Sequence, residues 1–246
     1  MKFEAKVVEE IYASKVAKRY DHAVPPLFSV WKKRAFNESS LKKGDRVIVF
    51  CCGTGLDFGH IIKIIGKEGR IVGVDFSSQM LNLAQKKITK NKWDNVELIE
   101  ADITSFDKRN IKNGMAATTT SKNSNNKLEN FTLKNFTLDD MINKKFDVGV
   151  CTLGMSIIPN YKAAYENLTA MVKKQGEVII GDMQLASGRL ARLNPVTIHM
   201  AKKFGGTFDG HQNSLEITAL MKKELTPVVK REFFFKSYYY CIGKKA

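Results

Sequence analysis

Two short segments carry residues whose types and spacing could bind a nucleoside. Residues 47–55 begin as an uncharged apolar run, which predicts a buried parallel strand, and end in the glycine turn Gly53-Thr54-Gly55. Residues 71–75 form a second apolar run that ends in Asp75, twenty residues after Gly55. A carboxylate at the end of the second strand of such a unit accepts hydrogen bonds from ribose hydroxyls. Together the two segments predict a nucleoside cofactor site.

The residues after the glycine turn bear on which cofactor binds, because NAD, FAD and S-adenosylmethionine all suit a turn of this kind. The dinucleotide fingerprint is G-x-G-x-x-G, but Phe58 stands where its third glycine belongs. Asp57 would also lie beside a pyrophosphate at the start of the helix, where a second negative charge is unfavourable. The turn therefore favours a cofactor without phosphates and with a cationic centre.

Alternating strand and helix patterns surround these two segments. Strands are expected at 47–50, 70–75, 95–100, 146–151 and 178–182, and helices at 5–20, 25–37, 57–66, 78–91 and 161–174. Two strand-like runs near the C-terminus, 228–235 and 238–242, are two residues apart and predict an antiparallel hairpin at the sheet edge. Strands alternating with helices through right-handed crossovers give a doubly wound α/β sheet.

Length and composition favour one soluble domain over residues 1–246. Within it we expect an N-terminal helical cap (1–40), a polar flexible insertion (108–137) and a helical segment that covers the substrate (183–225). No apolar run approaches the roughly 18–20 residues that span a bilayer, and no apolar signal region opens the chain, so a cytoplasmic protein is expected. The four cysteines show no metal-ligand spacing, so no metal site is expected.

The formal net charge of +15 favours binding to nucleic acid or to anionic membranes. The lysines are spread along the chain, however, which is typical of a solvated surface. Residues 186–206 combine apolar side chains with arginines and lysines. Such a stretch suits peripheral contact with an anionic membrane, and it equally suits a helix that covers a substrate.

Several segments, in this order and spacing, resemble the class I S-adenosylmethionine-dependent methyltransferases. They are Cys52–Gly55, Gly73–Leu81, Asn95–Asp102, Phe146–Val148, Gly176–Val178 and the terminal hairpin. The resemblance implies a Rossmann-like, seven-stranded, mostly parallel sheet with a C-terminal antiparallel hairpin and N-terminal helices that cap the cofactor. It also implies that S-adenosylmethionine is bound and S-adenosylhomocysteine is released. Residues 16–21 and 188–195 further resemble the ubiquinone/menaquinone C-methyltransferase-like and phospholipid N-methyltransferase-like group.

The resemblance assigns roles to individual residues. Gly53 and Gly55 would let the backbone pass under the methionine and ribose, and Asp75 would accept both ribose hydroxyls. Asp102 would accept from the adenine amino group, while Tyr20 closes over the cofactor. The implied cofactor site comprises Tyr20, Cys51, Gly53, Thr54, Gly55, Asp57, Asp75, Phe76, Met80, Asp102, Ile103, Cys151 and Thr152.

One departure from the family pattern concerns the methionine ammonium. The family usually carries an acid two residues before the first glycine in D-x-G-x-G-x-G, whereas Val49 and Cys51 occupy those places here. The ammonium then needs another partner, and Asp57 at the start of the following helix is the candidate. The alternative is a weakened or lost cofactor site.

Methyl transfer is an in-line displacement at the sulfonium carbon, so the protein must align the acceptor and remove any proton that it carries. Tyr20, His22 and His199 are the candidate bases, with His211 a further histidine of this kind, and an amine acceptor needs none. The expected acceptor is a small molecule or lipid, either an amine headgroup or a quinone. The alternatives are a non-catalytic cofactor-binding protein and an RNA methyltransferase. The second is disfavoured because residues 152–155 hold no N-P-P-Y-type tetrapeptide.

Overall fold

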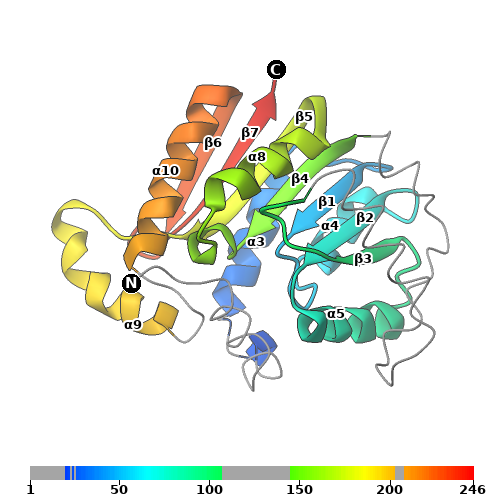
Figure 1. Ribbon diagram of the computed structural model, residues 1–246, viewed down its shortest axis with the longest axis horizontal. Helices are drawn as coiled ribbons and strands as arrows, with labels where there is room; N and C mark the ends of the chain where they lie inside the picture. The colour runs from blue at the N-terminus through cyan, green and yellow to red at the C-terminus, as the bar shows by residue number, and fades with distance from the viewer. Residues whose placement is uncertain (1–19, 23, 25, 107–144, 203–207) are drawn as a thin grey trace.

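The computed structural model describes residues 20–22, 24, 26–106, 145–202 and 208–246 (Figure 1). The helix predicted over 5–20, apart from Tyr20, and the insertion predicted over 108–137 lie outside the described residues. In the part of the chain that is described, no helix has the length and apolar character needed to cross a membrane.

The centre of the structure is one seven-stranded sheet in the order β3-β2-β1-β4-β5-β7-β6. Its strands are β1 (Arg46–Phe50), β2 (Arg70–Asp75), β3 (Val96–Glu100), β4 (Phe146–Thr152), β5 (Val172–Met183), β6 (Leu225–Phe233) and β7 (Tyr238–Lys245). Strands β1 to β5 pair in parallel, and β7 runs antiparallel to both β5 and β6. The predicted Rossmann-like sheet and its terminal hairpin are confirmed.

Helices cover both faces of this sheet (Figure 1). Helices α3 (Pro26–Glu38), α4 (Phe58–Ile65) and α5 (Ser78–Asn91) pack on one face, and α8 (Tyr161–Met171) and α10 (Phe208–Glu224) on the other. The shorter elements are η1 (Met155–Ile157), η2 (Gly188–Leu193) and α9 (Asn194–Lys202). Alternate residues of β1 enter opposite cores, Val47 and Val49 on one side and Ile48 and Phe50 on the other.

Helix α5 shows how local signals fix an element next to the site. The Ser77 hydroxyl caps its N-terminus by accepting from the Met80 backbone N–H at 3.4 Å. At the other end Lys92 adopts the left-handed conformation, with φ 54°. The buried face consists of Met80, Leu81, Ala84 and Ile88. The helix therefore begins one residue after its cap and starts close to the end of β2.

The predicted helix over 161–174 is three residues too long. It ends at Met171, and Val172 already belongs to β5, where it pairs with Phe146 of β4. Val172 is fully buried in that pairing, and the neighbouring Lys173 forms an ion pair with Asp147. These partners lie in β4, distant in sequence, so the strand displaces the last turn of the helix.

The predicted hairpin needs a similar correction at its turn. Strand β6 ends at Phe233 instead of 235, so residues 234–237 connect it to β7. Phe234, Phe235 and Lys236 all adopt the left-handed conformation, with φ of 47°, 55° and 67°. This conformation is incompatible with an extended strand, and it ends β6 two residues early.

The Phe58 side chain joins the glycine turn to strand β2. Its ring is fully buried and fills the space next to two glycines. A Cβ atom at Gly55 would lie 2.6 Å from the Phe58 ring, and one at Gly73 would lie 2.7 Å from it. The aromatic residue at the place of the third fingerprint glycine thus packs against glycines on two other segments.

This packing predicts that Gly73→Ala destabilises the protein by about 1–3 kcal/mol, because the added methyl group overlaps a ring that cannot move. Gly59→Ala is the matched control: its Cβ would meet the Trp93 ring at an ordinary 3.5 Å. Since Gly59 lies inside α4, that change should stabilise by about 0.5–1 kcal/mol. Urea denaturation of the three proteins measures both effects. Equal midpoints for both variants would contradict the packing argument.

Candidate functional site

The candidate site lies at the carboxyl edge of the parallel strands. Strand β1 pairs with β2 on one side and with β4 on the other, so the turns that follow these three strands meet at this edge. The chain order reverses here, since β2 and β3 extend the sheet in one direction and β4 and β5 in the other. Such a switch point is the usual place for a ligand in an open α/β sheet.

The Asp75 carboxylate is fixed between two of these turns. One oxygen accepts from the Gly53 backbone N–H at 2.8 Å, and the other accepts from the Ser77 N–H at 3.0 Å. Burial raises the pKa of Asp75 to about 6, although the bonds from Ser77, Gly53 and Phe76 act in the opposite direction. Because a carboxylate offers about four lone-pair positions, acceptor capacity remains for a ligand hydroxyl.

The glycine turn requires residues that tolerate positive φ. Gly53 and Gly55 have φ of 53° and 74°, and Cys51 also adopts the left-handed conformation with φ 51°. A side chain at Gly53 would in addition meet the Met80 terminal methyl group at 3.4 Å. The turn is therefore a bare backbone surface beside the carboxylate of Asp75.

The short turn at residues 20–22 packs over this backbone surface. Tyr20 lies in an apolar cluster with Phe76, Met80, Leu83 and Ile157. Its neighbour Asp21 accepts a hydrogen bond from the Thr54 hydroxyl and pairs with Lys87 at 2.9 Å. Burial raises the pKa of Tyr20 above its usual range, and the charges of Asp57, Asp75 and Asp182 raise it further. Its hydroxyl therefore stays protonated at neutral pH.

The Asp57 carboxylate is already engaged within the protein. One oxygen lies 3.0 Å from the Lys32 ammonium of α3, and the other accepts from the Thr152 hydroxyl at 2.5 Å. Both side chains of the ion pair are at most 7% exposed. Asp57, expected to meet the methionine ammonium, thus holds the ammonium of a lysine, and Thr152 turns towards Asp57.

Sequence reasoning missed Lys32, although a signal was present. Buried residues of α3 recur at helical spacing, at Phe28, Trp31, Ala35 and Phe36, and Lys32 falls on that same face. A lysine on the apolar face of a helix needs a buried anion. Which acid Lys32 pairs with depends on how α3 lies on the sheet, and local sequence does not specify that.

Cys51 and Cys151 meet on the other side of the glycine turn. A hydrogen bond between the two thiols, together with burial, holds the pKa of Cys51 well above its usual range. Gly154 makes room for the pair, because a Cβ there would lie 2.7 Å from the Cys51 sulfur and 3.1 Å from the Cys151 sulfur. Both cysteines are free thiols, and both belong to the edge that carries Asp75.

A comparison with protein families decides the class of protein to which this edge belongs. The family model described as "Methyltransferase domain" matches residues 41–232, which run from before β1 almost to the end of β6. The chain belongs to this methyltransferase family. The predicted class I S-adenosylmethionine-dependent methyltransferase is thereby confirmed, and S-adenosylmethionine is the methyl donor of this class.

Curated relatives of the methyltransferase match it over a limited stretch. It is 37% identical over 73 residues to the demethylmenaquinone methyltransferase of Staphylococcus carnosus, which covers 30% of each chain. The same enzyme of Lactobacillus johnsonii is 37% identical over 73 residues, 29% of this chain and 30% of the relative. The matched stretch thus spans less than a third of these relatives.

Solved structures share the fold of the methyltransferase at low sequence identity. A SAM-dependent methyltransferase from Aquifex aeolicus has a TM-score of 0.62 and 13% identity, over 95% of this chain and all of that one. The N-methyltransferase NodS from Bradyrhizobium japonicum, solved with S-adenosylhomocysteine, has a TM-score of 0.59 and 12% identity, over 98% and 97% of the two chains. These matches establish the fold.

The loop after β3 holds the methyltransferase residues predicted to face adenine. Asp102 is exposed, and its carboxylate accepts from the Thr104 backbone N–H at 2.8 Å. Ile103 is buried, and its carbonyl accepts from the Asn167 side chain at 2.9 Å. The Ala101 N–H donates to the Asp75 carbonyl at 3.0 Å, which ties this loop to the end of β2.

The methyltransferase has a further buried acid at the end of β5. Asp182 is 1% exposed and accepts from the Ser156 backbone N–H and hydroxyl, both at 2.8 Å. Burial raises its pKa to about 6. Of the histidines considered as bases, His22 and His199 are exposed, and His211 is buried on α10. The charge of Asp182 acts on the Tyr20 hydroxyl, and with burial and the charges of Asp57 and Asp75 it raises the pKa of Tyr20.

The buried pair predicts that Lys32→Met destabilises the protein by about 3–5 kcal/mol, because Asp57 is left as an unpaired buried charge. Adding Asp57→Asn should recover much of that loss, since both charges are then removed. Lys87→Met is the control, because the Lys87–Asp21 pair is more exposed and should contribute within about 1 kcal/mol. Thermal and urea unfolding at pH 7 measure the four proteins. If Lys32→Met were no more harmful than Lys87→Met, the Lys32–Asp57 pair would not be a structural element.

Proposed function

We propose that the protein transfers the methyl group of S-adenosylmethionine to a quinone-like or other small lipid acceptor. The observation that carries the cofactor half is the Asp75 carboxylate, held by the Gly53 and Ser77 N–H groups beside the bare glycine turn. The acceptor half rests on the partial match to demethylmenaquinone methyltransferases.

The nucleoside end of the cofactor would lie between β2 and the turn at residues 20–22. In this arrangement Asp75 accepts from the ribose hydroxyls, and the adenine lies among Tyr20, Phe76 and Met80, which already form one apolar cluster. Asp102 follows β3 at the rim of the same edge and would accept from the adenine amino group. Burial of an aromatic base against such side chains favours binding.

The methionine end would lie over Gly53 and Gly55, towards Cys51 and Cys151. Asp57 holds the primary ammonium of Lys32, and the cofactor carries an ammonium group of the same kind. We infer that the cofactor ammonium binds the Asp57 carboxylate in place of part or all of the Lys32 contact. The N–H donors of Lys32 that are released then bind the methionine carboxylate. Asp57 then takes the role of the acid that Val49 cannot fill.

The acceptor would approach from the side of β4 and β5. Because Tyr20 stays protonated, it can donate a hydrogen bond to an acceptor oxygen but cannot serve as the base at neutral pH. Asp182 has a pKa of about 6, so it is largely ionised at pH 7 and lies within the range useful for general base catalysis. A quinol hydroxyl could lose its proton towards this acid as the ring carbon attacks the methyl group.

Calorimetric titration with S-adenosylhomocysteine tests the cofactor site. Wild type should bind, and Asp75→Ala should weaken binding by about ten- to a hundredfold, since a charge-assisted hydrogen bond is lost. Asp94→Ala, an exposed acid before β3, is the control and should bind as wild type does. Labelled methyl transfer is then compared for a short-chain demethylated quinol, phosphatidylethanolamine and RNA. No binding by wild type would leave a scaffold without turnover, and labelling of RNA alone would overturn the proposed acceptor.

The pKa of Asp75 predicts the pH dependence of this binding. Below about pH 6 the folded protein carries a protonated Asp75, which has lost an acceptor for the ribose hydroxyls. The dissociation constant for S-adenosylhomocysteine should therefore rise by up to about tenfold per pH unit as the pH falls from 6 to 5. Asp75→Asn should bind weakly and without this dependence. A dependence that persists in Asp75→Asn would assign the titration to another group, such as Asp182.

A further inference from the structure

Exposed aromatic side chains occupy the turn between β6 and β7. Phe234 and Phe235 are 43% and 57% exposed, and their ring centroids lie 5.6 Å apart. Both residues and the following Lys236 adopt the left-handed backbone conformation, which is unfavourable for side chains other than glycine, asparagine and aspartate. The fold thus holds two phenylalanines outward on a strained turn and gives them little contact with the core.

The two helices that contact this turn also carry exposed apolar residues. Helix α3 contributes Leu27 and Val30, and its Trp31 ring lies 6.3 Å from that of Phe234. Helix α9 contributes Val196, and the next residue, Thr197, hydrogen-bonds Ser237 of the turn at 3.0 Å. We call this set the turn surface, and it consists of Leu27, Val30, Val196, Phe234 and Phe235. Exposed apolar residues on three elements that contact one another are typical of an interaction site.

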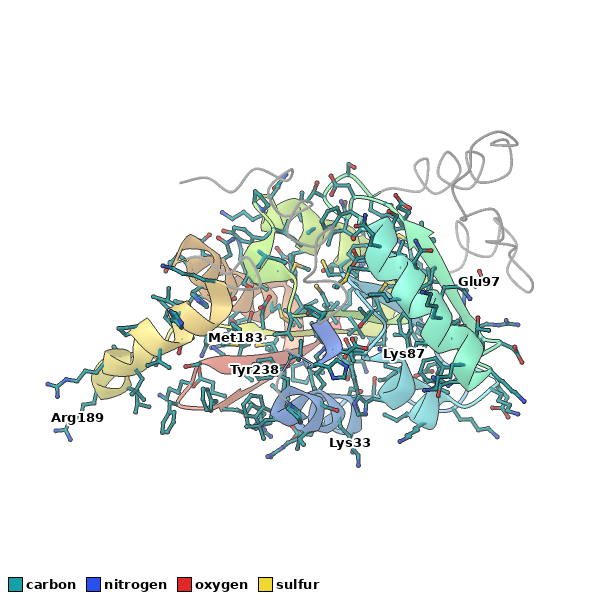
Figure 2. The ribbon with its side chains drawn as sticks, turned by 90° about the horizontal axis from the view of Figure 1, so that it is seen from below. Lys33, Lys87, Glu97, Met183, Arg189 and Tyr238 are labelled. Atoms are coloured by element: carbon teal, nitrogen blue, oxygen red, sulfur yellow. The ribbon has the colours of Figure 1, made fainter. Side chains whose placement is uncertain are left out.

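The turn surface lies at the same edge of the sheet as the candidate site. Tyr238, the first residue after the turn, pairs with Met183, the last residue of β5 (Figure 2). Asp182 directly precedes Met183, so the buried acid and the turn are joined by adjacent pairs of one ladder. A partner bound to the turn surface would therefore sit at the edge of the sheet that carries the candidate site.

Exposed cations lie on the turn itself, on α3 and on η2, which directly precedes α9. Lys33, Arg189, Arg192 and Lys236 are exposed, and Figure 2 shows Lys33 and Arg189 pointing outward from the ribbon. Among the described residues none of these four has an ion-pair partner. The nearby acids Glu38 and Glu232 are already paired with Arg34, Arg231 and Lys230. Exposed apolar side chains, with unpaired cations on the same and adjoining elements, complement an anionic lipid surface.

We propose that the turn surface docks the protein on an anionic lipid bilayer, with Phe234 and Phe235 entering the interface and the surrounding cations contacting the headgroups. The role of this docking rests on the proposed function, because docking would bring a bilayer-embedded acceptor to the site. Exposed phenylalanines could also stack on RNA bases, but Leu27, Val30 and Val196 are aliphatic and offer no ring for a base. The lipid surface uses all five residues.

Vesicle co-sedimentation tests the proposal. Wild type should bind vesicles of phosphatidylcholine that contain about 30 mol% phosphatidylglycerol and should bind poorly to phosphatidylcholine alone. It should dissociate from the anionic vesicles as the salt concentration rises. Phe234→Ser with Phe235→Ser should weaken binding at least about tenfold, because both inserted rings are lost. Leu215→Ser is the matched control, an exposed leucine on α10 at the opposite face of the sheet. A second variant, Arg192→Glu with Lys236→Glu, reverses the charge of two of the four cations and leaves the phenylalanines in place, so it should also weaken binding to the anionic vesicles.

The readouts separate this proposal from the proposed function. The phenylalanine variant should still bind S-adenosylhomocysteine and methylate a soluble short-chain acceptor, while methylation of the same acceptor in vesicles falls with vesicle binding. If wild type binds vesicles but not S-adenosylhomocysteine, docking holds and the proposed function fails. Wild type that ignores anionic vesicles, a phenylalanine variant that binds them undiminished, or retention of single-stranded RNA that depends on the same phenylalanines would each overturn the docking proposal.

Discussion

The ring of Phe58 fills the space beside Gly55 and Gly73, and the geometry of the site depends on that packing. It fixes the first turn of α4 against β2, so the residue before it, Asp57, and the residue that ends β2, Asp75, keep a set separation. The Gly53 N–H can then reach the Asp75 carboxylate. A dinucleotide-binding protein places a glycine where Phe58 stands. Here the helix supplies the large residue, Phe58, and the strand supplies the small one, Gly73.

Two carboxylates illustrate how this framework sets chemistry through environment. Asp57 lies against a lysine ammonium and a threonine hydroxyl, whereas Asp75 is held by backbone N–H groups alone. The N–H donors offset only part of the desolvation that raises the pKa of Asp75. In this structure one acid is therefore paired with a side-chain cation, while the other keeps acceptor capacity for a ligand.

Local signals predicted those parts of the fold that local forces determine. Strand β2 and helix α5 match their predicted ranges, because a continuous buried run and a serine cap specify them without help from distant residues. The predicted end of α8 was wrong. Val172 and Lys173 continue the helical pattern in the sequence, but their partners on β4 make them part of a strand. Two other features could not be predicted for the same reason. The acid that pairs with Lys32 depends on the orientation of α3, and Phe234 adopts a left-handed conformation at a position without glycine, the usual sequence signal for it.

The place of β7 between β5 and β6 has a consequence for synthesis of the chain. Strand β5 leaves the ribosome long before Tyr238, the residue that begins its antiparallel neighbour. Until then the outer edge of β5 exposes unpaired backbone groups, and β6 has no strand on which to form. Nascent chains arrested within this interval would hold an open, apolar sheet edge that attracts chaperones or other nascent chains. Emergence of β7 from the ribosome thus decides when the parallel sheet becomes protected.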